Sequence, residues 1–298
     1  MRLLLTLSLC LFCLSPAWAG LEIFACEPEW GALARELSLP DAEIFSATTG
    51  LQDPHRIQAR PALIARLRRA DLLVCTGAEL EVGWLPLLLR RAHNPRVQSG
   101  KPGNLEAARY VRLRGIPQRL DRAEGDIHAS GNPHIQTDPR NILRVAREMA
   151  KRLSTIDPSH ADEYNARLED FSRRWKEAMK RWKRQGRALR GGKVVVYHDQ
   201  WLYLLHWLKM EQVATLEPKP GVPPTPGHLA DLKARLQANP AKLILRAPFM
   251  DPKPARWLSA QTGIPAVVLP YTVGGDPAAG DLFQLFDLTL QRLGAGKP

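Results

Sequence analysis

Short apolar runs alternate with helix-like segments in two separate parts of the chain. In the first part, strand-like runs at 21–26, 42–47 and 71–77 alternate with helix-like segments at 29–38 and 61–70. The second part repeats this order, with strand-like runs at 192–199, 241–247 and 265–271 and helix-like segments at 202–208, 228–237, 254–262 and 280–293. Runs rich in Val, Ile and Leu that alternate with helices indicate parallel sheets covered on both faces. We therefore expect an α/β fold with two lobes, each a mostly parallel sheet flanked by helices.

A helical stretch separates these two parts. Asp138-Pro139 and Asp157-Pro158 each pair an N-cap residue with a proline at the first helical position. After Asp157, an apolar residue recurs at every third or fourth position, which predicts one buried stripe along a long, rigid helix. The stripe consists of Tyr164, Leu168, Phe171, Trp175, Met179 and Trp182.

The start of the chain has the features of a cleavable signal peptide. Arg2 precedes the apolar run LLLTLSLCLFCLSP, and Ala17-Trp18-Ala19 is a small-x-small cleavage site. The apolar run is short for a membrane span, so we expect a soluble periplasmic protein. The predicted segments are a signal peptide at 1–19, an N-terminal lobe at 20–138, linking helices at 139–187 and a C-terminal lobe at 188–298.

The chain is strongly basic, with a formal net charge of +12. Such a charge can indicate nucleic-acid binding, but export argues against a nucleic-acid partner. The densest basic run, RRWKEAMKRWKRQGRALR at 173–190, lies mostly opposite the apolar stripe of the long helix. A solvated helix face is the plain interpretation, and attraction to an anionic membrane surface or to a partner there is the alternative.

Two cysteines remain after the signal peptide, and each follows a strand-like run. Cys26 ends the run at 21–26 and Cys75 lies in the run at 71–77. Export makes a disulfide possible, and two buried free thiols are the alternative. The spacing leaves both open, because it does not give the Cα separation.

Three histidines fall in the loops that parallel sheets use for ligands. His55 follows the strand-like run at 42–47, His134 precedes the helix cap at Asp138, and His198 lies at the end of the run at 192–199. In open parallel sheets, ligands bind beyond the carboxyl ends of the strands. Neutral imidazoles suit a borderline metal such as zinc, which takes about four ligands. These residues are therefore candidate ligands of one metal ion.

The fourth ligand is open at this stage. Asp276 follows a Gly-Gly pair in the last loop and is a candidate, although it could instead cap the final helix, as could Asp281. Water could also hold the fourth position. Other polar residues near the three histidines are candidates for a capture site or for hydrogen bonds that orient the ligands; these are His128, Asp53, Asp138 and Asp199.

Five motifs in this order resemble those of a known family. QDPH, TGAELEVGW, GNPHIQTDP, VVVYHDQW and LPYTVGGD look like the motifs of the periplasmic solute-binding proteins of zinc and manganese ABC importers, the zinc-uptake and TroA-like proteins. The resemblance spans the whole chain after residue 19. It implies two α/β lobes bridged by a long rigid helix, with a metal at their interface. It also implies His55, His134 and His198 as ligands.

Some family members place an aspartate where this chain has Thr272, so Asp276 is a displaced match for that ligand. The resemblance implies a membrane permease as partner and leaves a periplasmic metallochaperone open. Three neutral histidines with at most one carboxylate favour zinc over manganese. We expect a monomeric zinc-capturing protein rather than an enzyme.

Two other functions remain as alternatives. A periplasmic zinc hydrolase would need a general base, for which Glu79 or Asp276 is the candidate, but the chain lacks an HExxH or GxSxG motif. A binding or adhesion protein with a structural metal is the other. Glu79 and Glu81 follow the strand-like run at 71–77 and could contact the site, a neighbouring loop or the transporter.

Overall fold

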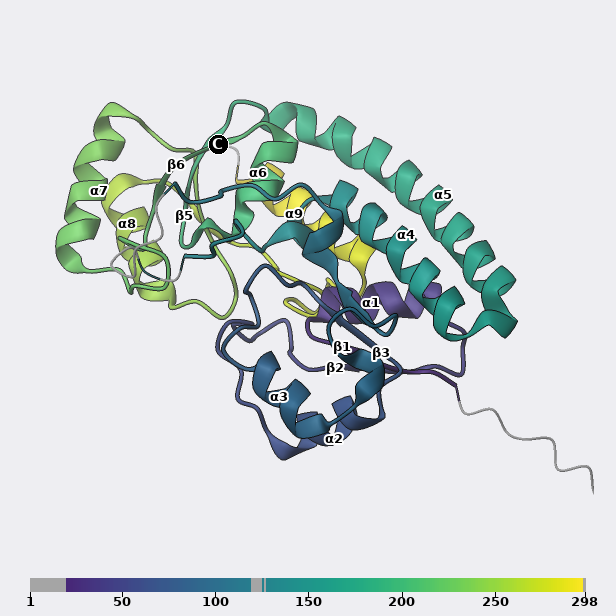
Figure 1. Ribbon diagram of the computed structural model, residues 1–298. Helices are drawn as coiled ribbons and strands as arrows, with labels where there is room; N and C mark the ends of the chain where they lie inside the picture. The colour runs from purple at the N-terminus through teal and green to yellow at the C-terminus, as the bar shows by residue number, and fades with distance from the viewer. Residues whose placement is uncertain (1–19, 119–124, 126, 297–298) are drawn as a thin grey trace, which may run out of the picture.

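Two four-stranded parallel sheets form the frame of the molecule (Figure 1). The computed structural model describes residues 20–118, 125 and 127–296, so the predicted signal peptide lies outside the described residues. The first sheet has the order β2-β1-β3-β4 and contains β1 (Glu22–Ala25), β2 (Glu43–Ser46), β3 (Leu72–Cys75) and β4 (Asn104–Glu106). The second has the order β6-β5-β7-β8 and contains β5 (Lys193–Val196), β6 (Glu211–Thr215), β7 (Leu243–Arg246) and β8 (Ala266–Val268).

The same strand order therefore occurs twice, and the predicted two-sheet α/β fold is confirmed. Central strands β3 and β5 are buried almost throughout, as their continuous apolar runs require. The helices that accompany the sheets are α1 (Pro28–Leu37), α2 (Pro61–Arg69), α3 (Leu85–Ala92), α4 (Pro139–Ile156), α5 (Ala161–Gln185), α6 (Leu202–Leu208), α7 (Pro226–Ala238), α8 (Pro252–Thr262) and α9 (Leu282–Ala295). In the described ranges, no helix has the length and apolarity that a membrane crossing needs.

The sequence pattern missed three elements, namely α3, β4 and β6. β4 has only three residues, and β6 reads EQVAT, which contains no continuous apolar run. Both are strands because they pair with a strongly apolar neighbour, β4 with β3 and β6 with β5. Pairing with a partner strand can override weak local preference.

The two predicted helix starts differ in outcome. The Asp138 side chain accepts a hydrogen bond from the amide of Arg140, and α4 begins at Pro139 as predicted. Pro158 instead begins a 3-10 turn, and α5 starts three residues later at Ala161. The Asp157 carboxylate accepts a hydrogen bond from the Tyr164 hydroxyl at 2.7 Å, which ties this turn to the first turn of α5.

The predicted apolar stripe of α5 is confirmed, because Tyr164, Phe171, Trp175 and Trp182 are all buried. Helix α5 runs along the outside of the molecule and packs against α1, α4 and α9 (Figure 1). It therefore contacts helices that accompany both sheets. The exact lobe boundaries at 138 and 187 remain a prediction.

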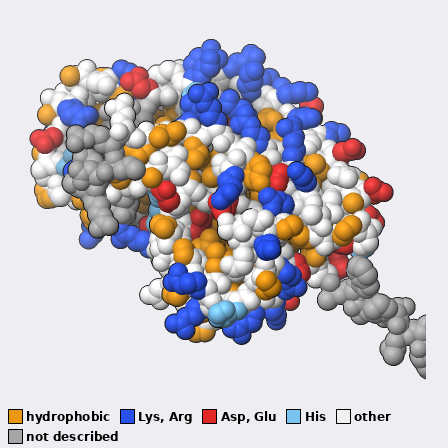
Figure 2. Space-filling model, in the orientation of Figure 1, with side chains coloured by type: hydrophobic (Ala, Val, Ile, Leu, Met, Phe, Trp, Pro, Cys, Tyr) orange, Lys and Arg blue, Asp and Glu red, His pale blue; other side chains and the backbone are white. Residues whose placement is uncertain are grey.

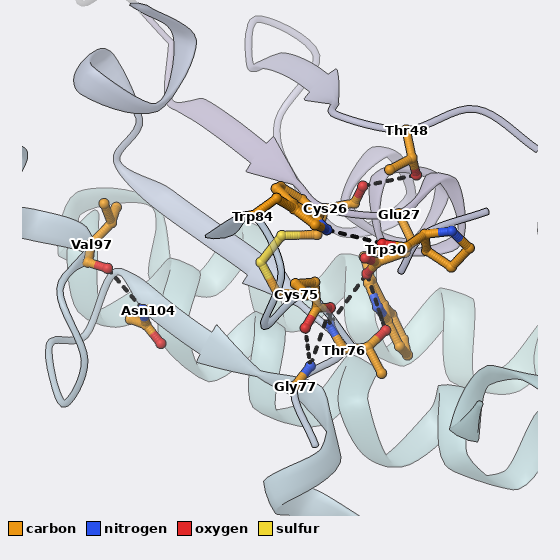
Figure 3. The surroundings of a disulfide bond; sticks show 12 residues. Cys26, Glu27, Trp30, Thr48, Cys75, Thr76, Gly77, Trp84, Val97 and Asn104 are labelled. Atoms are coloured by element: carbon orange, nitrogen blue, oxygen red, sulfur yellow. Dashed lines mark hydrogen bonds between the residues drawn. A yellow bond between two sulfur atoms is a disulfide. The ribbon is translucent and has the colours of Figure 1, made fainter. Parts of the chain in front are cut away.

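Cys26 and Cys75 form a disulfide, which decides between the two alternatives left by the sequence (Figure 3). They lie at the carboxyl ends of the neighbouring strands β1 and β3, with their Cα atoms 4.8 Å apart. Both side chains are buried. The disulfide thus links the two strands at the edge from which the ligand-carrying loops leave the first sheet.

We expect Trp175→Ala to lower the free energy of unfolding by about 3–5 kcal/mol, because it removes a fully buried indole. It also removes the hydrogen bond that the Trp175 Nε1 donates to the carbonyl of Pro139 at 2.8 Å. The measurement is urea unfolding followed by circular dichroism. The adjacent, exposed Lys176→Ala is the control and should change stability by less than about 0.5 kcal/mol. Equal losses in both variants would contradict the importance of the stripe.

Candidate metal centre

The structure brings His55, His134 and His198 together. The centroid of the His134 ring lies 5.3 Å from the centroids of the His55 and His198 rings, and the centroids of the His55 and His198 rings are 5.9 Å apart. The Nε2 atoms of His134 and His198 are 3.3 Å apart. One nitrogen from each of the three rings lies within 4.8 Å of the other two, so the group could hold a metal ion.

Three different parts of the chain supply these rings. His55 lies in the loop between β2 and α2, and His198 lies two residues beyond β5. His134 stands just before the short 3-10 turn that leads into α4. Its backbone amide donates to the Asn132 side chain at 3.0 Å, which fixes the turn between Gly131 and α4. The site therefore lies where loops from the two sheets meet, a region that we call the seam.

Each imidazole is held through its Nδ1 atom by a neighbouring side chain. The carboxylates accept from the ring N–H, and the tyrosine hydroxyl pairs with the third ring. The pairs are His55 with Asp53 Oδ1 at 2.7 Å, His134 with the Tyr271 hydroxyl at 2.7 Å, and His198 with Glu217 Oε2 at 2.8 Å. An Nδ1 contact of this kind fixes the ring and leaves the Nε2 lone pair available to a metal.

Burial and charge tune the three rings differently. Burial, with His55 and His198 nearby, holds the pKa of His134 well below its ordinary value, so this ring stays neutral. Burial also acts to lower the pKa of His198, but the hydrogen bond that its ring donates to Glu217 and the charge of Asp199 outweigh it and raise the pKa. His198 is therefore the ring of this pair that binds a proton more readily as pH falls.

The rings line a cavity of about 340 Å³. Asp53, Tyr271 and Glu217, which hold the three rings, also line it. Other parts of its wall are apolar, with Phe249 and Met250 among the residues that form it. Arg56 and Gln200 also line it, so the cavity combines polar groups with apolar side chains, which is typical of a ligand site.

Asp276, the predicted fourth ligand, is not part of this group. Its carboxylate accepts hydrogen bonds from the amide of Ala278 at 2.9 Å and from Arg292 at 2.5 Å. These bonds hold the side chain within its own loop and against α9. Asp281 caps α9 instead, since its side chain accepts from the amide of Gln284.

The other polar candidates divide between the site and its surroundings. The His128 ring lies 5.3 Å from that of His55, and burial together with His55 lowers its pKa to about 4. Asp199 places Oδ1 3.5 Å from Nε2 of His198. Asp138 does not join them, because its carboxylate caps α4 and pairs with Arg140 at 2.6 Å.

Glu79 and Glu81 serve the loops of the first sheet. Glu79 accepts hydrogen bonds from the amide of Ala129 at 2.5 Å and from the Ser130 hydroxyl at 3.2 Å, so it contacts a neighbouring loop. The buried Glu81 accepts hydrogen bonds from the amides of Thr76 and Gly77. Of the three options that the sequence left for Glu79, the structure therefore supports contact with a neighbouring loop.

Glu81 belongs to a cluster of three buried carboxyl groups that the sequence did not predict. Glu27, Glu29 and Glu81 are each at most 3% exposed. Burial raises the pKa of Glu29 and of Glu81 to about 7, and burial together with Glu81 raises the pKa of Glu27 well above its ordinary value. Glu29, on α1, accepts a hydrogen bond from Thr272 in the loop after β8, which links the two sheets beside the histidines.

Sequence reasoning also missed Glu217 and Tyr271 as partners of the histidines. Tyr271 lies three residues beyond β8, at the carboxyl end of a strand, where parallel sheets place ligand-binding residues. Glu217 lies two residues beyond β6, and it was missed because that strand was missed. The feature of the sequence that could have indicated Glu217 and Tyr271 was their position just beyond the carboxyl end of a strand.

The comparisons with known proteins agree on one family. The family model described as "Zinc-uptake complex component A periplasmic" (ZnuA) matches residues 23–296. The high-affinity zinc uptake system protein ZnuA of Yersinia pestis is 22% identical over 238 residues, which cover 74% of this chain and 71% of that protein. The manganese ABC transporter substrate-binding lipoprotein PsaA of Streptococcus anginosus is 20% identical over 252 residues, covering 82% and 79%.

Solved structures show the same fold. A crystal structure of ZnuA superimposes with a TM-score of 0.77 at 19% identity, and the match covers 94% of this chain and 100% of that one. The manganese-bound periplasmic metal-binding protein of Candidatus Liberibacter asiaticus has a TM-score of 0.73 at 16% identity, covering 92% and 98%.

We expect stability to fall as pH rises from about 4.5 to about 7, because the folded state keeps the proton of Glu29 that the unfolded state releases near pH 4.5. The stabilisation is complete below the lower value and lost above the higher one. Glu29→Gln removes the pH-dependent contribution of this residue to the free energy of unfolding. The variant should be more stable than the wild type at pH 8, by on the order of 3 kcal/mol. Urea unfolding at several pH values measures the slope. The exposed Glu177→Gln is the control and should keep the wild-type slope; an unchanged slope in Glu29→Gln would show that Glu29 is ionised in the folded protein.

Proposed function

We propose that this chain, which belongs to the ZnuA family of periplasmic zinc-uptake proteins, captures zinc and delivers it to the membrane permease of an ABC importer. The observation that carries the proposal is the convergence of His55, His134 and His198, each ring held through Nδ1 with Nε2 left for a metal. The zinc and manganese transport proteins among its relatives support metal as the cargo. We further propose that capture takes place in the periplasm, after export by the segment at 1–19.

The donor set supports zinc as the preferred cargo. Zn–N bonds of 2.0–2.1 Å in a tetrahedron place neighbouring donors about 3.3 Å apart. The Nε2 atoms of His134 and His198 already have this separation, at 3.3 Å. Manganese prefers carboxylate and other oxygen donors, whereas imidazole suits zinc. A set dominated by imidazole nitrogens therefore fits zinc better than manganese.

We propose Asp199 as the fourth donor, in place of Asp276. Its Oδ1 lies 3.5 Å from Nε2 of His198, close to the separation of two donors on one zinc ion. Asp276 lacks this relation to the rings because Arg292 and the amide of Ala278 hold its carboxylate. A carboxylate on the metal would also offset part of the charge that zinc brings into a buried site.

The family is one of substrate-binding transport proteins, and the candidate bases give no support to a hydrolase. Glu79 is engaged by Ala129 and Ser130, and Asp276 by Arg292. We therefore propose binding and release of the metal as the whole of the chemistry. The metallochaperone and the monomeric state remain predictions.

We expect His134→Ala to lower zinc affinity by at least about 100-fold, because it removes a buried donor from the centre of the group. Isothermal titration calorimetry with zinc, started from chelator-treated protein, measures the affinity and the stoichiometry. His93→Asn is the control, since His93 is exposed, has the left-handed conformation that Asn tolerates, and lies outside the group. Unchanged affinity in His134→Ala would remove this residue from the site and with it the proposed zinc-capture function.

We expect Asp199→Asn to lower zinc affinity about tenfold or more, while Asp276→Asn leaves it unchanged. The two substitutions remove the same charge, so the comparison separates a donor from a general electrostatic effect. Competition titration with a coloured zinc chelator resolves the difference. The opposite ranking would restore Asp276 as the fourth donor.

A further inference from the structure

A line of exposed cations runs along the C-terminal half of α5 and the 3-10 turn that follows it (Gly186–Leu189). We name it the basic ridge and define it by seven side chains, all exposed: Lys176, Lys180, Arg181, Lys183, Arg184, Arg187 and Arg190. Figure 2 shows Lys and Arg side chains gathered along the upper edge of the molecule, over α5. At 1.5 Å per helical residue, the ridge is roughly 20 Å long.

The charge of the ridge is largely uncompensated. Residues 176–190 contain these seven cations and one acid, Glu177, so they carry a net charge of +6, half of the +12 of the whole chain. Glu177 pairs with Lys180 at 2.8 Å, and Arg181 lies 3.9 Å from Asp287. Within the described part of the chain, five members form no ion pair with a carboxylate; they are Lys176, Lys183, Arg184, Arg187 and Arg190.

Packing fixes which way the ridge faces. Ala178, Trp182 and Leu189 are buried on the opposite side of the same segment, and the Trp182 Nε1 donates to Asp287 at 2.6 Å. These buried side chains fix the rotation of the helix about its axis, so the cations of the ridge stay together on its exposed face. Interaction with the helix dipole accounts for cations in the last turn of α5, but the ridge begins at Lys176 and continues to Arg190, beyond both ends of that turn.

We propose that the basic ridge binds the anionic phospholipid headgroups of a membrane surface. The remaining exposed positions of residues 176–190 are Glu177, Gln185 and Ala188, so the ridge has no exposed aromatic or large apolar side chain. Protein interfaces usually depend on such anchors, whereas an anionic lipid surface attracts a row of flexible cations without them. Binding is then peripheral, reversible and dependent on salt.

Binding at the ridge leaves the metal centre accessible. No ridge residue lines the cavity of the three histidines, and α5 packs on α1, α4 and α9. The ridge and the centre are therefore separate sites. The protein can concentrate at the membrane surface that holds its permease while its histidines remain free to take metal.

Co-sedimentation of the chain from residue 20 with vesicles tests the proposal. The vesicles contain phosphatidylglycerol and phosphatidylethanolamine, and vesicles of phosphatidylcholine alone serve as the uncharged comparison. We expect binding only to the anionic vesicles, and its loss at about 0.5 M salt, where the screening length is only a few ångströms. The ridge variant carries Lys183→Glu, Arg184→Glu and Arg187→Glu. The control variant carries Arg60→Glu, Arg90→Glu and Arg91→Glu, so it undergoes the same change in net charge. Two of its sites, Arg90 and Arg91, lie in the last turn of α3.

We expect the ridge variant to bind anionic vesicles at least about 100-fold more weakly than the wild type, and the control variant to lose much less. Both should keep the wild-type zinc affinity, which separates this proposal from the metal site. If the charge reversals disturb folding, judged by circular dichroism, Gln at the same three ridge positions replaces them. Equal losses in ridge and control variants, binding that resists salt, or no binding to anionic vesicles would each overturn the proposal.

Discussion

Three contacts at Nδ1 atoms are the interactions on which the centre depends. An imidazole on a loop can rotate about two side-chain bonds. The Nε2 atoms of the three rings point toward one another only when a hydrogen bond at each Nδ1 fixes the orientation of the ring. Asp53 holds His55 from within the same loop, whereas Tyr271 and Glu217 hold the other two rings from loops after strands β8 and β6. The orientation of two of the three rings is therefore set by groups that the second sheet positions, and that of His55 by its own loop.

The rest of the fold keeps these loops in place. Each sheet presents the carboxyl ends of its strands toward the seam, and α5 packs with its aromatic stripe against helices that accompany both sheets. The disulfide joins the ends of β1 and β3, and Glu29 bonds to Thr272 across the seam. A continuous helix without internal Gly or Pro favours small movements of loops over a wide hinge between the sheets.

Much of this could be predicted from local patterns. The parallel sheets, the α5 stripe and the cap at Asp138 follow from periodicity and capping chemistry, which are properties of short segments. β6 could not be predicted, because pairing with β5 rather than its own composition makes it a strand. Glu217 was missed for that reason, and the sequence could not predict that Arg292, sixteen residues away, donates to the Asp276 carboxylate.

The repeated strand order has a consequence for how the centre is assembled. One histidine follows β2 of the first sheet, one follows β5 of the second, and the third belongs to the turn before α4 that joins the two halves. Neither half, produced as a separate fragment, would carry a complete set of nitrogens. A group of three nitrogens close enough for one ion therefore exists only while both sheets fold as one chain.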